Sequence, residues 1–355
     1  MGKKRSEYHI SDLLIGILPL GIWIAYFALI ACPFADALAF NPFQIDMRDM
    51  EGKELTSDDY VEIQKRLRQI DIREFLREKY NSECTSKVFV PCQSFYDRTA
   101  RSLYQTLIDV EKGLIPQKEL VQINKGGNRC VVCSVPFGGK YTYYVNTLVQ
   151  GLKDTGFNGY FLYFIGGWPN PTGREIRYVS VPYSFKIFAM LEAQTLGFNH
   201  VLWIDAACYP LRNIEPLFDI IARNGALLNW FHTPSDSLQH IFPGTKQLLI
   251  DLTGVDVLRA KFVNSIVMGI KMDSPEAKRF LQKYYEFAEM GTPFLSWFPE
   301  EFVFTAIIND GNYPGWLAAS PPRLVQGSAK QADDSPREFD IVRRAGVYFY
   351  HRKGR

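Results

Sequence analysis

From residue 128 onward, short apolar runs alternate with amphipathic stretches. Apolar runs bounded by turn residues predict strands, and apolar positions at helical spacing predict helices between them. The predicted strands are residues 130–136, 160–165, 200–204 and 226–231, and the predicted helices are residues 141–153, 185–196 and 211–223. Strands that alternate with helices of about 10 to 15 residues are typical of βαβ units. The pattern therefore predicts an α/β fold with a mostly parallel sheet flanked by helices.

A long apolar run lies near the N-terminus. Residues 13–31 carry no charge, and about 20 apolar residues are enough to cross a bilayer as a helix. The basic residues of the preceding tail, residues 1–12, and the acidic residues beyond the run place the N-terminus in the cytoplasm by the positive-inside rule. We therefore expect a single transmembrane anchor at residues 13–33, with the main body across the membrane.

A cleavable signal peptide is the alternative. It would share the basic start, and Ala37-Leu38-Ala39 resembles a cleavage site. The apolar run is longer than the usual signal-peptide core of about 7 to 15 residues, and a buried core helix would normally be amphipathic. The anchor is the favoured interpretation, and it predicts a single-pass membrane protein.

Between the anchor and the alternating pattern, the chain resembles a helical stem. Helix-capping residues begin at Thr56, and apolar residues then recur among many charges. A second helical stretch runs near residues 98–112, and Gly126-Gly127 breaks the pattern. We expect a stem at residues 34–127 and a catalytic domain at residues 128–355.

Composition and charge narrow the classes of function. Apolar residues make up 47% and charged residues 22%, a balance typical of a folded domain. The net charge is only +2, and nucleic-acid-binding proteins usually show a basic stripe. We therefore expect no nucleic-acid partner.

The cysteines do not have the spacing of a four-cysteine zinc site. Cys130 and Cys133 lie on a predicted strand, where residues three positions apart point to opposite faces. We therefore interpret them as small hydrophobic residues of the core. Cys84 and Cys92 would close a disulfide loop in an oxidising compartment. The sequence leaves this pairing open.

The sharpest candidate for chemistry is Asp205, which directly follows the apolar run 200–204. Ligands of open α/β sheets bind beyond the carboxyl ends of the strands, so a carboxylate there reaches a metal ion or a ribose hydroxyl. The alternative is an Asp that caps the following turn or helix. The residue alone leaves both interpretations open.

The neighbouring residues resemble a known family. The segment HVLWIDAACYPLRNIEPLFDII is similar to the nucleotide-sugar-binding segment of GT-A fold glycosyltransferases, in which an apolar strand runs into an Asp-x-Asp motif. Asp205 matches the first acid, which contacts the nucleotide sugar, and Ala207 replaces the last acid, which binds Mn²⁺ or Mg²⁺. The resemblance covers residues 129–355 and implies a GT-A (Rossmann-like) fold.

The resemblance also implies further donor-binding residues. Residues 131–140 match the first strand and the loop that meets the nucleotide base, which includes Pro136 and Lys140. Lys186 would bind a donor phosphate as a point charge, and Asn264 would bind sugar hydroxyls. The alternative for Lys186 is a solvated lysine at the start of a helix. The alternative for Asn264 is a polar residue at the start of an ordinary core strand.

Two later segments complete the implied site. Glu300 and Glu301 begin a segment like the acid-led helix that faces the acceptor, where a carboxylate acts as base. The alternative is a favourable interaction with the helix N-terminus. A strand near the C-terminus delivers His351, Arg352 and Lys353, which resemble the terminal groups that bind metal or diphosphate. A metal ion, Mn²⁺ or Mg²⁺, would then have Asp205 and His351 as protein ligands.

The resemblance implies a glycosyltransferase that moves a sugar from a nucleotide-sugar donor, first of all a UDP-sugar, to a hydroxyl of a glycan or glycoprotein. The predicted topology then places the catalytic domain in a Golgi-type lumen if the source is eukaryotic. Two alternatives remain. Ala207 favours a transferase-like binding protein without activity, and Gly138-Gly139-Lys140 weakly resembles the loop of a sugar nucleotidyltransferase.

Overall fold

A computed structural model of the chain describes residues 45–69, 115–136, 140–232, 240–318, 323–327 and 336–352. Its centre is a six-stranded sheet in the order β1-β3-β2-β4-β7-β6. The strands are β1 (Gln117–Ile123), β2 (Arg129–Val135), β3 (Gly159–Ile165), β4 (His200–Ile204), β6 (Ala226–His232) and β7 (Lys261–Lys271). The four strands predicted from apolar runs thus correspond to β2, β3, β4 and β6, which confirms the α/β class.

The sheet is mixed rather than mostly parallel. β2 pairs in parallel with both β3 and β4, whereas β1–β3, β4–β7 and β6–β7 are antiparallel pairs. The prediction of a mostly parallel sheet is therefore too simple. An apolar run locates a buried strand but does not give its direction, and the strands that run against the others, β1 and β7, were not among the four predicted from the alternating pattern.

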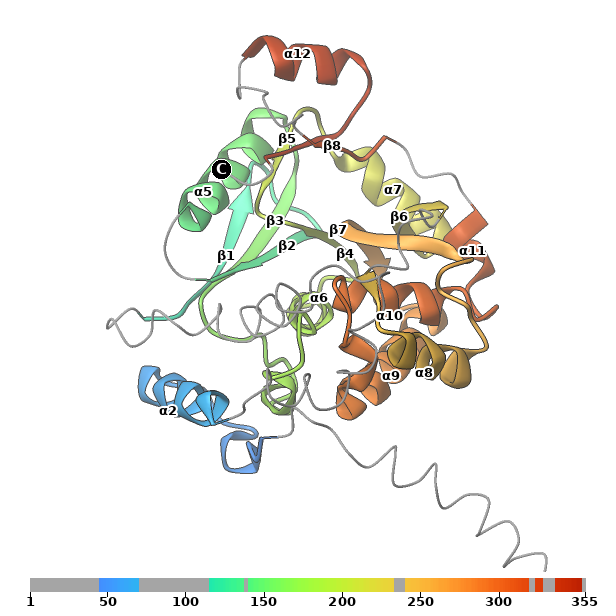
Figure 1. Cartoon of the computed structure of the whole chain (residues 1–355). Coiled ribbons are helices and arrows are strands. Elements are labelled where there is room, and N and C mark those ends of the chain that lie inside the picture. The colour runs from blue at the N-terminus through green and yellow to red at the C-terminus, as the bar shows by residue number, and fades with distance from the viewer. Residues whose placement is uncertain are drawn as a thin grey trace, which may run out of the picture. The chain divides into compact units, whose positions relative to one another are not determined.

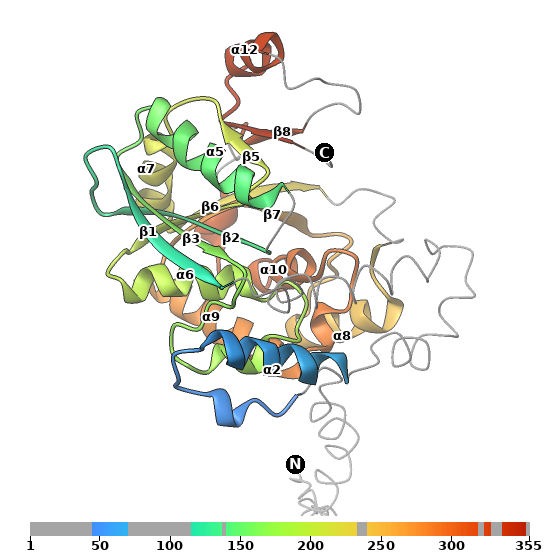
Figure 2. The same cartoon turned by 90° about the vertical axis from the view of Figure 1, so that its left-hand side faces the viewer.

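Helices cover both faces of the sheet (Figures 1 and 2). In both views α5 and α7 lie on one side of the sheet, and α6, α9 and α10 lie on the other. The helices are α2 (Ser57–Arg68), α5 (Tyr141–Asp154), α6 (Phe185–Thr195), α7 (Glu215–Asn224), α8 (Pro243–Thr253), α9 (Pro275–Met290), α10 (Pro299–Ile308), α11 (Pro314–Ala318) and α12 (Pro336–Arg344). Short 3-10 turns occur at Arg48–Met50, Glu175–Tyr178 and Thr292–Phe294. Because both faces are covered, the central strands consist mostly of apolar residues.

A second, three-stranded sheet carries the C-terminal residues to the exit of β4. It has the order β5-β9-β8, with β5 (Cys208–Pro210), β9 (Phe349–His351) and β8 (Val325–Gly327). Gly151 lets α5 approach this sheet closely, because a Cβ atom there would lie 2.7 Å from the Pro210 side chain. The pairing of Cys208 with His351 places the C-terminal residues a few positions from Asp205.

The stem predicted at residues 34–127 is not a separate helical segment where the structure describes it. α2 is present, and Thr56 and Asp59 form its capping box as expected. Its residues Ile63 and Leu67 are fully buried, however, and belong to the main hydrophobic core. Strand β1 also belongs to the central sheet, so the boundary predicted at residue 128 cuts through this compact part of the chain.

Several predictions fall on residues outside those that the structure describes. They are the anchor at residues 13–33, the helical stretch near residues 98–112, the Cys84–Cys92 pairing and Lys353. Within the described ranges, no helix combines the length and the apolar character needed to cross a bilayer.

Candidate functional site

A cavity of about 300 Å³ opens at the carboxyl ends of β2 and β4. The first residues of α5 and α6 and the residues after β9 complete its wall. The lining residues are Ser134, Val135, Pro136, Lys140, Tyr141, Tyr144, Tyr183, Phe185, Lys186, Trp203, Asp205, Ala206, Ala207, His351 and Arg352. We call this space the Asp205 cavity. It brings together Pro136, Lys140, Lys186, Asp205, Ala207, His351 and Arg352, all of which the sequence singled out.

Asp205 is held rigidly at the mouth of the sheet. Its backbone N–H donates to the carbonyl oxygen of Ile266 at 2.9 Å. Its Oδ1 accepts hydrogen bonds from the Trp203 indole Nε1 at 2.9 Å and from the Lys186 Nζ at 3.1 Å. The side chain remains 29% exposed, and Oδ2 has no hydrogen-bond partner among the described residues. Asp205 therefore offers one fixed carboxylate oxygen to a ligand.

Lys186 is buried between carboxylates. Besides Asp205, its Nζ donates to the Glu300 Oε1 at 2.9 Å and to the Ser265 Oγ at 2.8 Å. Burial alone would lower the pKa of the Lys186 ammonium, but the charges of Asp205 and Glu300 outweigh it and hold that pKa above its ordinary value. All three N–H bonds of the ammonium are thus directed at protein oxygens. The expected contact with a donor phosphate would require Lys186 to give up one of them.

Glu300 and Glu301 lie behind Lys186 and do not line the Asp205 cavity. The Ser265 Oγ donates to the Glu300 Oε1 at 2.8 Å. The Glu301 Oε1 accepts from the Asn264 Nδ2 at 2.7 Å and from the Ser265 N–H at 3.0 Å. Burial, together with the charge of Glu300, raises the pKa of Glu301 to about 8. Both glutamates and Asn264 therefore support the site from behind, and the acceptor-facing role expected for Glu300 and Glu301 is not seen in this arrangement.

Two further cations, Arg352 and Lys140, line the cavity. The Arg352 Nη1 donates to the Thr147 Oγ1 at 3.1 Å, and the guanidinium carbon lies 4.9 Å from the centre of the Tyr209 ring and 5.6 Å from that of Tyr144. The Lys140 Nζ lies 5.9 Å from the same Tyr144 ring. In the described part of the chain, neither Arg352 nor Lys140 forms an ion pair with a carboxylate. These two side chains therefore bring positive charge to the cavity that no carboxylate of the described residues offsets.

Aromatic residues supply most of the remaining wall. The sequence pattern did not indicate them as residues of the site. They are Tyr141, Tyr144, Tyr183, Phe185 and Trp203. Alternation along a strand could have indicated Trp203, because residues 203 and 205 project to the same face. Tyr183 has a φ of 59°, which is uncommon for a large side chain and is found more often at binding sites. The cavity combines aromatic faces with a few polar groups, as small-molecule sites do.

The residues present are a poor match to a divalent metal ion. Asp205 already shares Oδ1 with the Lys186 ammonium, and Ala207 has no side-chain ligand to offer. Among the residues that the structure describes, no three His, Cys, Asp or Glu side chains gather closely enough to hold an ion. The predicted pair of metal ligands, Asp205 and His351, would have to bind the ion beside an ammonium group.

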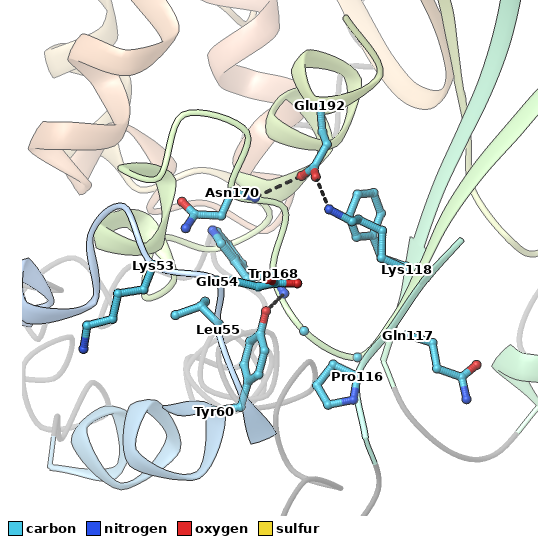
Figure 3. A pocket seen from close by; sticks show the side chains of 13 residues that line it. Lys53, Glu54, Leu55, Tyr60, Pro116, Gln117, Lys118, Trp168, Asn170 and Glu192 are labelled. Atoms are coloured by element: carbon cyan, nitrogen blue, oxygen red, sulfur yellow. Dashed lines mark hydrogen bonds and ion pairs between the residues drawn. The ribbon is translucent and has the colours of Figure 1, made fainter. Parts of the chain in front are cut away.

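A second cavity, of about 340 Å³, lies between α2 and the loop after β3 (Figure 3). Trp168 lines this cavity, and its side chain is only 6% exposed. Its backbone N–H donates to the Tyr60 hydroxyl and its indole Nε1 donates to the Glu175 carbonyl oxygen. Lys118 and Glu192 form an ion pair at the edge of this space. Trp168 packs the loop here, and we place the candidate site at the Asp205 cavity, where the strand-end carboxylate lies.

Comparisons with known proteins give only a distant similarity. No family model matches the sequence, and no curated protein matches it. A solved structure described as the apo form of WbbM, a bifunctional glycosyltransferase, is similar with a TM-score of 0.38 and 11% sequence identity over 63% of this chain. The chain spans 45% of the length of that protein. A similarity this distant assigns neither a family nor an activity, so the residues of the site have to indicate the function.

Proposed function

We propose that this protein is a glycosyltransferase that moves a sugar from a nucleotide-sugar donor, first of all a UDP-sugar, to a hydroxyl of a glycan or glycoprotein. The observation that carries the proposal is that one cavity holds both a fixed carboxylate, Asp205, and two cations, Arg352 and Lys140, that form no ion pair within the described part of the chain. A nucleotide sugar has hydroxyl groups for the first and a diphosphate for the second.

The parts of a donor match the parts of the cavity. The aromatic side chains suit the flat nucleoside base. The Asp205 Oδ2, which has no hydrogen-bond partner among the described residues, suits a ribose or sugar hydroxyl. Arg352 suits the diphosphate because a guanidinium forms paired hydrogen bonds with phosphate oxygens. Lys140 adds a second positive charge at the start of α5. This arrangement favours a nucleotide sugar over a simple sugar.

The proposed reaction exchanges one bond for another. The acceptor oxygen forms a bond to the anomeric carbon, the bond from that carbon to the diphosphate oxygen breaks, and the acceptor proton leaves to a base or to solvent. Negative charge grows on the departing diphosphate, so Arg352 and Lys140 stabilise the transition state. Glu300 and Glu301 act as positioning residues, since they contact Lys186, Ser265 and Asn264.

The proposal includes a membrane anchor. The apolar residues 13–31 would hold the catalytic part across the membrane from the cytoplasmic N-terminus, in a Golgi-type lumen in a eukaryotic cell. Protease protection of sealed vesicles tests this topology. Digestion of the catalytic part in intact vesicles from a eukaryotic host would contradict it.

Replacement of Asp205 tests the activity. Asp205→Asn keeps the size of the side chain but removes its charge, and we expect transfer to fall by at least about 100-fold. The assay follows sugar transfer and donor hydrolysis with several nucleotide sugars. Asp219→Asn is the matched control, because Asp219 is 62% exposed on α7 and outside the cavity. Thermal unfolding of both variants separates lost chemistry from lost folding.

The outcomes distinguish the alternatives. Full turnover by the Asp205→Asn variant would remove the central role of this carboxylate. Nucleotide-sugar binding without transfer or hydrolysis by the unmodified chain would favour a transferase-like binding protein, as Ala207 suggests. Formation of a nucleotide sugar from a nucleoside triphosphate and a sugar phosphate would identify a nucleotidyltransferase instead.

A further inference from the structure

The protein carries its own cation beside Asp205. The Lys186 ammonium lies 3.1 Å from the Asp205 Oδ1, and it is fixed there by the Glu300 Oε1 at 2.9 Å and the Ser265 Oγ at 2.8 Å. The Lys186 side chain is only 6% exposed. A divalent ion bound to Asp205 would share this carboxylate with a buried positive charge and would be repelled by it.

A diphosphate still needs positive charge, and Arg352 and Lys140 supply it from the lining of the cavity. Arg352 is held in place by Thr147 and by the faces of Tyr144 and Tyr209, and its Nε is buried without a hydrogen-bond partner in the described part of the chain. An unpaired buried donor on a charged group is costly unless a ligand satisfies it. The Arg352 guanidinium is therefore prepared for an anion.

Ala207, two residues after Asp205, contacts Arg352 through the backbone. Its carbonyl oxygen accepts the Arg352 backbone N–H at 2.9 Å, so Arg352 directly adjoins the position at which the GT-A resemblance expects a metal-binding acid. A carboxylate at residue 207 would lie near the guanidinium and compete with a phosphate for it. With alanine there, the guanidinium has no carboxylate partner among the described residues, so the loss of the acid and the presence of the arginine are consistent with each other.

We propose that the site binds the diphosphate of its nucleotide ligand without a divalent metal ion, through Arg352 and Lys140, while Lys186 is the internal counter-ion that positions Asp205. This inference rests on the proposed function for the identity of the ligand as a nucleoside diphosphate or its sugar ester. In this site, side chains of the protein supply the positive charge that a metal ion would otherwise provide.

Calorimetric titration of the full-length chain in detergent micelles tests the inference. The probes are UDP, GDP, ADP and CDP, each titrated once in EDTA and once in Mn²⁺. We expect at least one of them to bind with an affinity that differs by less than about threefold between the two conditions. In EDTA, Arg352→Gln should weaken the binding of that diphosphate by about tenfold or more. It should weaken the binding of the corresponding nucleoside much less.

Two further variants serve as controls. Arg259→Gln changes an arginine that is 88% exposed and outside the cavity, and it should leave the affinity unchanged. Lys140→Gln should also weaken the binding of the diphosphate. This second variant keeps the test valid if the Arg352→Gln variant does not fold. Arg352→Lys retains the charge and should recover part of the affinity.

The possible failures are distinguishable. Binding that requires Mn²⁺ would overturn the metal-free site and leave the proposed transferase intact. If none of the four diphosphates binds in either condition, the proposed function itself fails. Equal weakening of diphosphate and nucleoside by Arg352→Gln would also overturn the inference, because it would show a structural role for Arg352 rather than a contact with phosphate.

Discussion

At the scale of single residues, the candidate site is organised around one buried ammonium group. Lys186 contacts Asp205, Glu300 and Ser265, and breaking a buried ion pair by removing one partner typically costs about 3 to 5 kcal/mol because it strands the other charge. The same contacts fix Asp205 at the cavity wall. Stability and ligand binding therefore depend on the same side chains.

Glu301 makes the stability of the protein depend on pH. Its pKa is raised from 4.5 to about 8, so between these values the folded protein holds a proton that the unfolded chain has lost. The stability linked to this group is complete below the unfolded pKa and is lost as the pH rises toward 8. We expect Glu301→Gln to remove a decline in unfolding free energy that approaches about 1.4 kcal/mol per pH unit.

Urea unfolding of both proteins from about pH 5 to pH 8 measures this decline. Glu286→Gln is the control, because Glu286 is 45% exposed and contacts Lys283 and Gln282 of its own helix. Parallel pH curves for the unmodified chain and the Glu301→Gln variant would show that Glu301 has an ordinary pKa in the folded protein.

The sequence predicted part of the site at this scale. Asp205 was identified because an acid directly after an apolar strand has a recognisable local pattern. The pairing of Lys186 with Asp205 and Glu300 was not predicted, since it joins residues of α6 and α10 to the residue that follows β4, and these are distant in the sequence. Only the folded sheet brings these residues together.

At the scale of elements, the alternating pattern gave the bounds of uniform segments most accurately. β4 begins and ends at the predicted residues, and α5 begins at the predicted residue 141 and ends one residue later than predicted. The helix predicted to start at residue 211 begins at Glu215 instead, because Leu211 follows β5 and Pro216 favours a later first turn.

Helix α2 was predicted correctly as a helix but interpreted incorrectly as part of a stem. Ile63 is fully buried in the main core, so Ile63→Ala should lower the unfolding free energy of the whole compact unit by about 2 to 5 kcal/mol. Lys65→Ala, at a side chain that is 65% exposed, should change it by less than about 0.5 kcal/mol.

Denaturant unfolding monitored by tryptophan fluorescence compares the two variants, because Trp203 and Trp168 report on the core of the sheet and on the α2 contact. An independent stem helix would give a different result. Ile63→Ala would then leave the main transition of the catalytic part unchanged.

At the scale of the compact unit from residue 42 to residue 355, the apolar pattern predicted the layers but not the connections between them. Buried runs and amphipathic helices were enough to predict a sheet covered by helices. The direction of β1 and β7, and the return of the C-terminal residues to β5, depend on long-range pairing that no local pattern records. The site belongs to this scale, because Lys140, Asp205 and Arg352 are far apart in the sequence and only the complete fold brings them to one cavity.

The extent of the folding unit gives the last prediction. A fragment of residues 128–355 lacks β1 and α2, so it exposes the edge of β3 and removes the buried Ile123 and the Tyr60 hydroxyl that binds Trp168. We expect this fragment to aggregate or to unfold without cooperativity, whereas residues 42–355 unfold in one transition. Soluble yield and thermal unfolding compare the two fragments. Equal melting temperatures would mean that β1 and α2 contribute nothing to the stability of the catalytic core, and the boundary first inferred at residue 128 would then be the correct one.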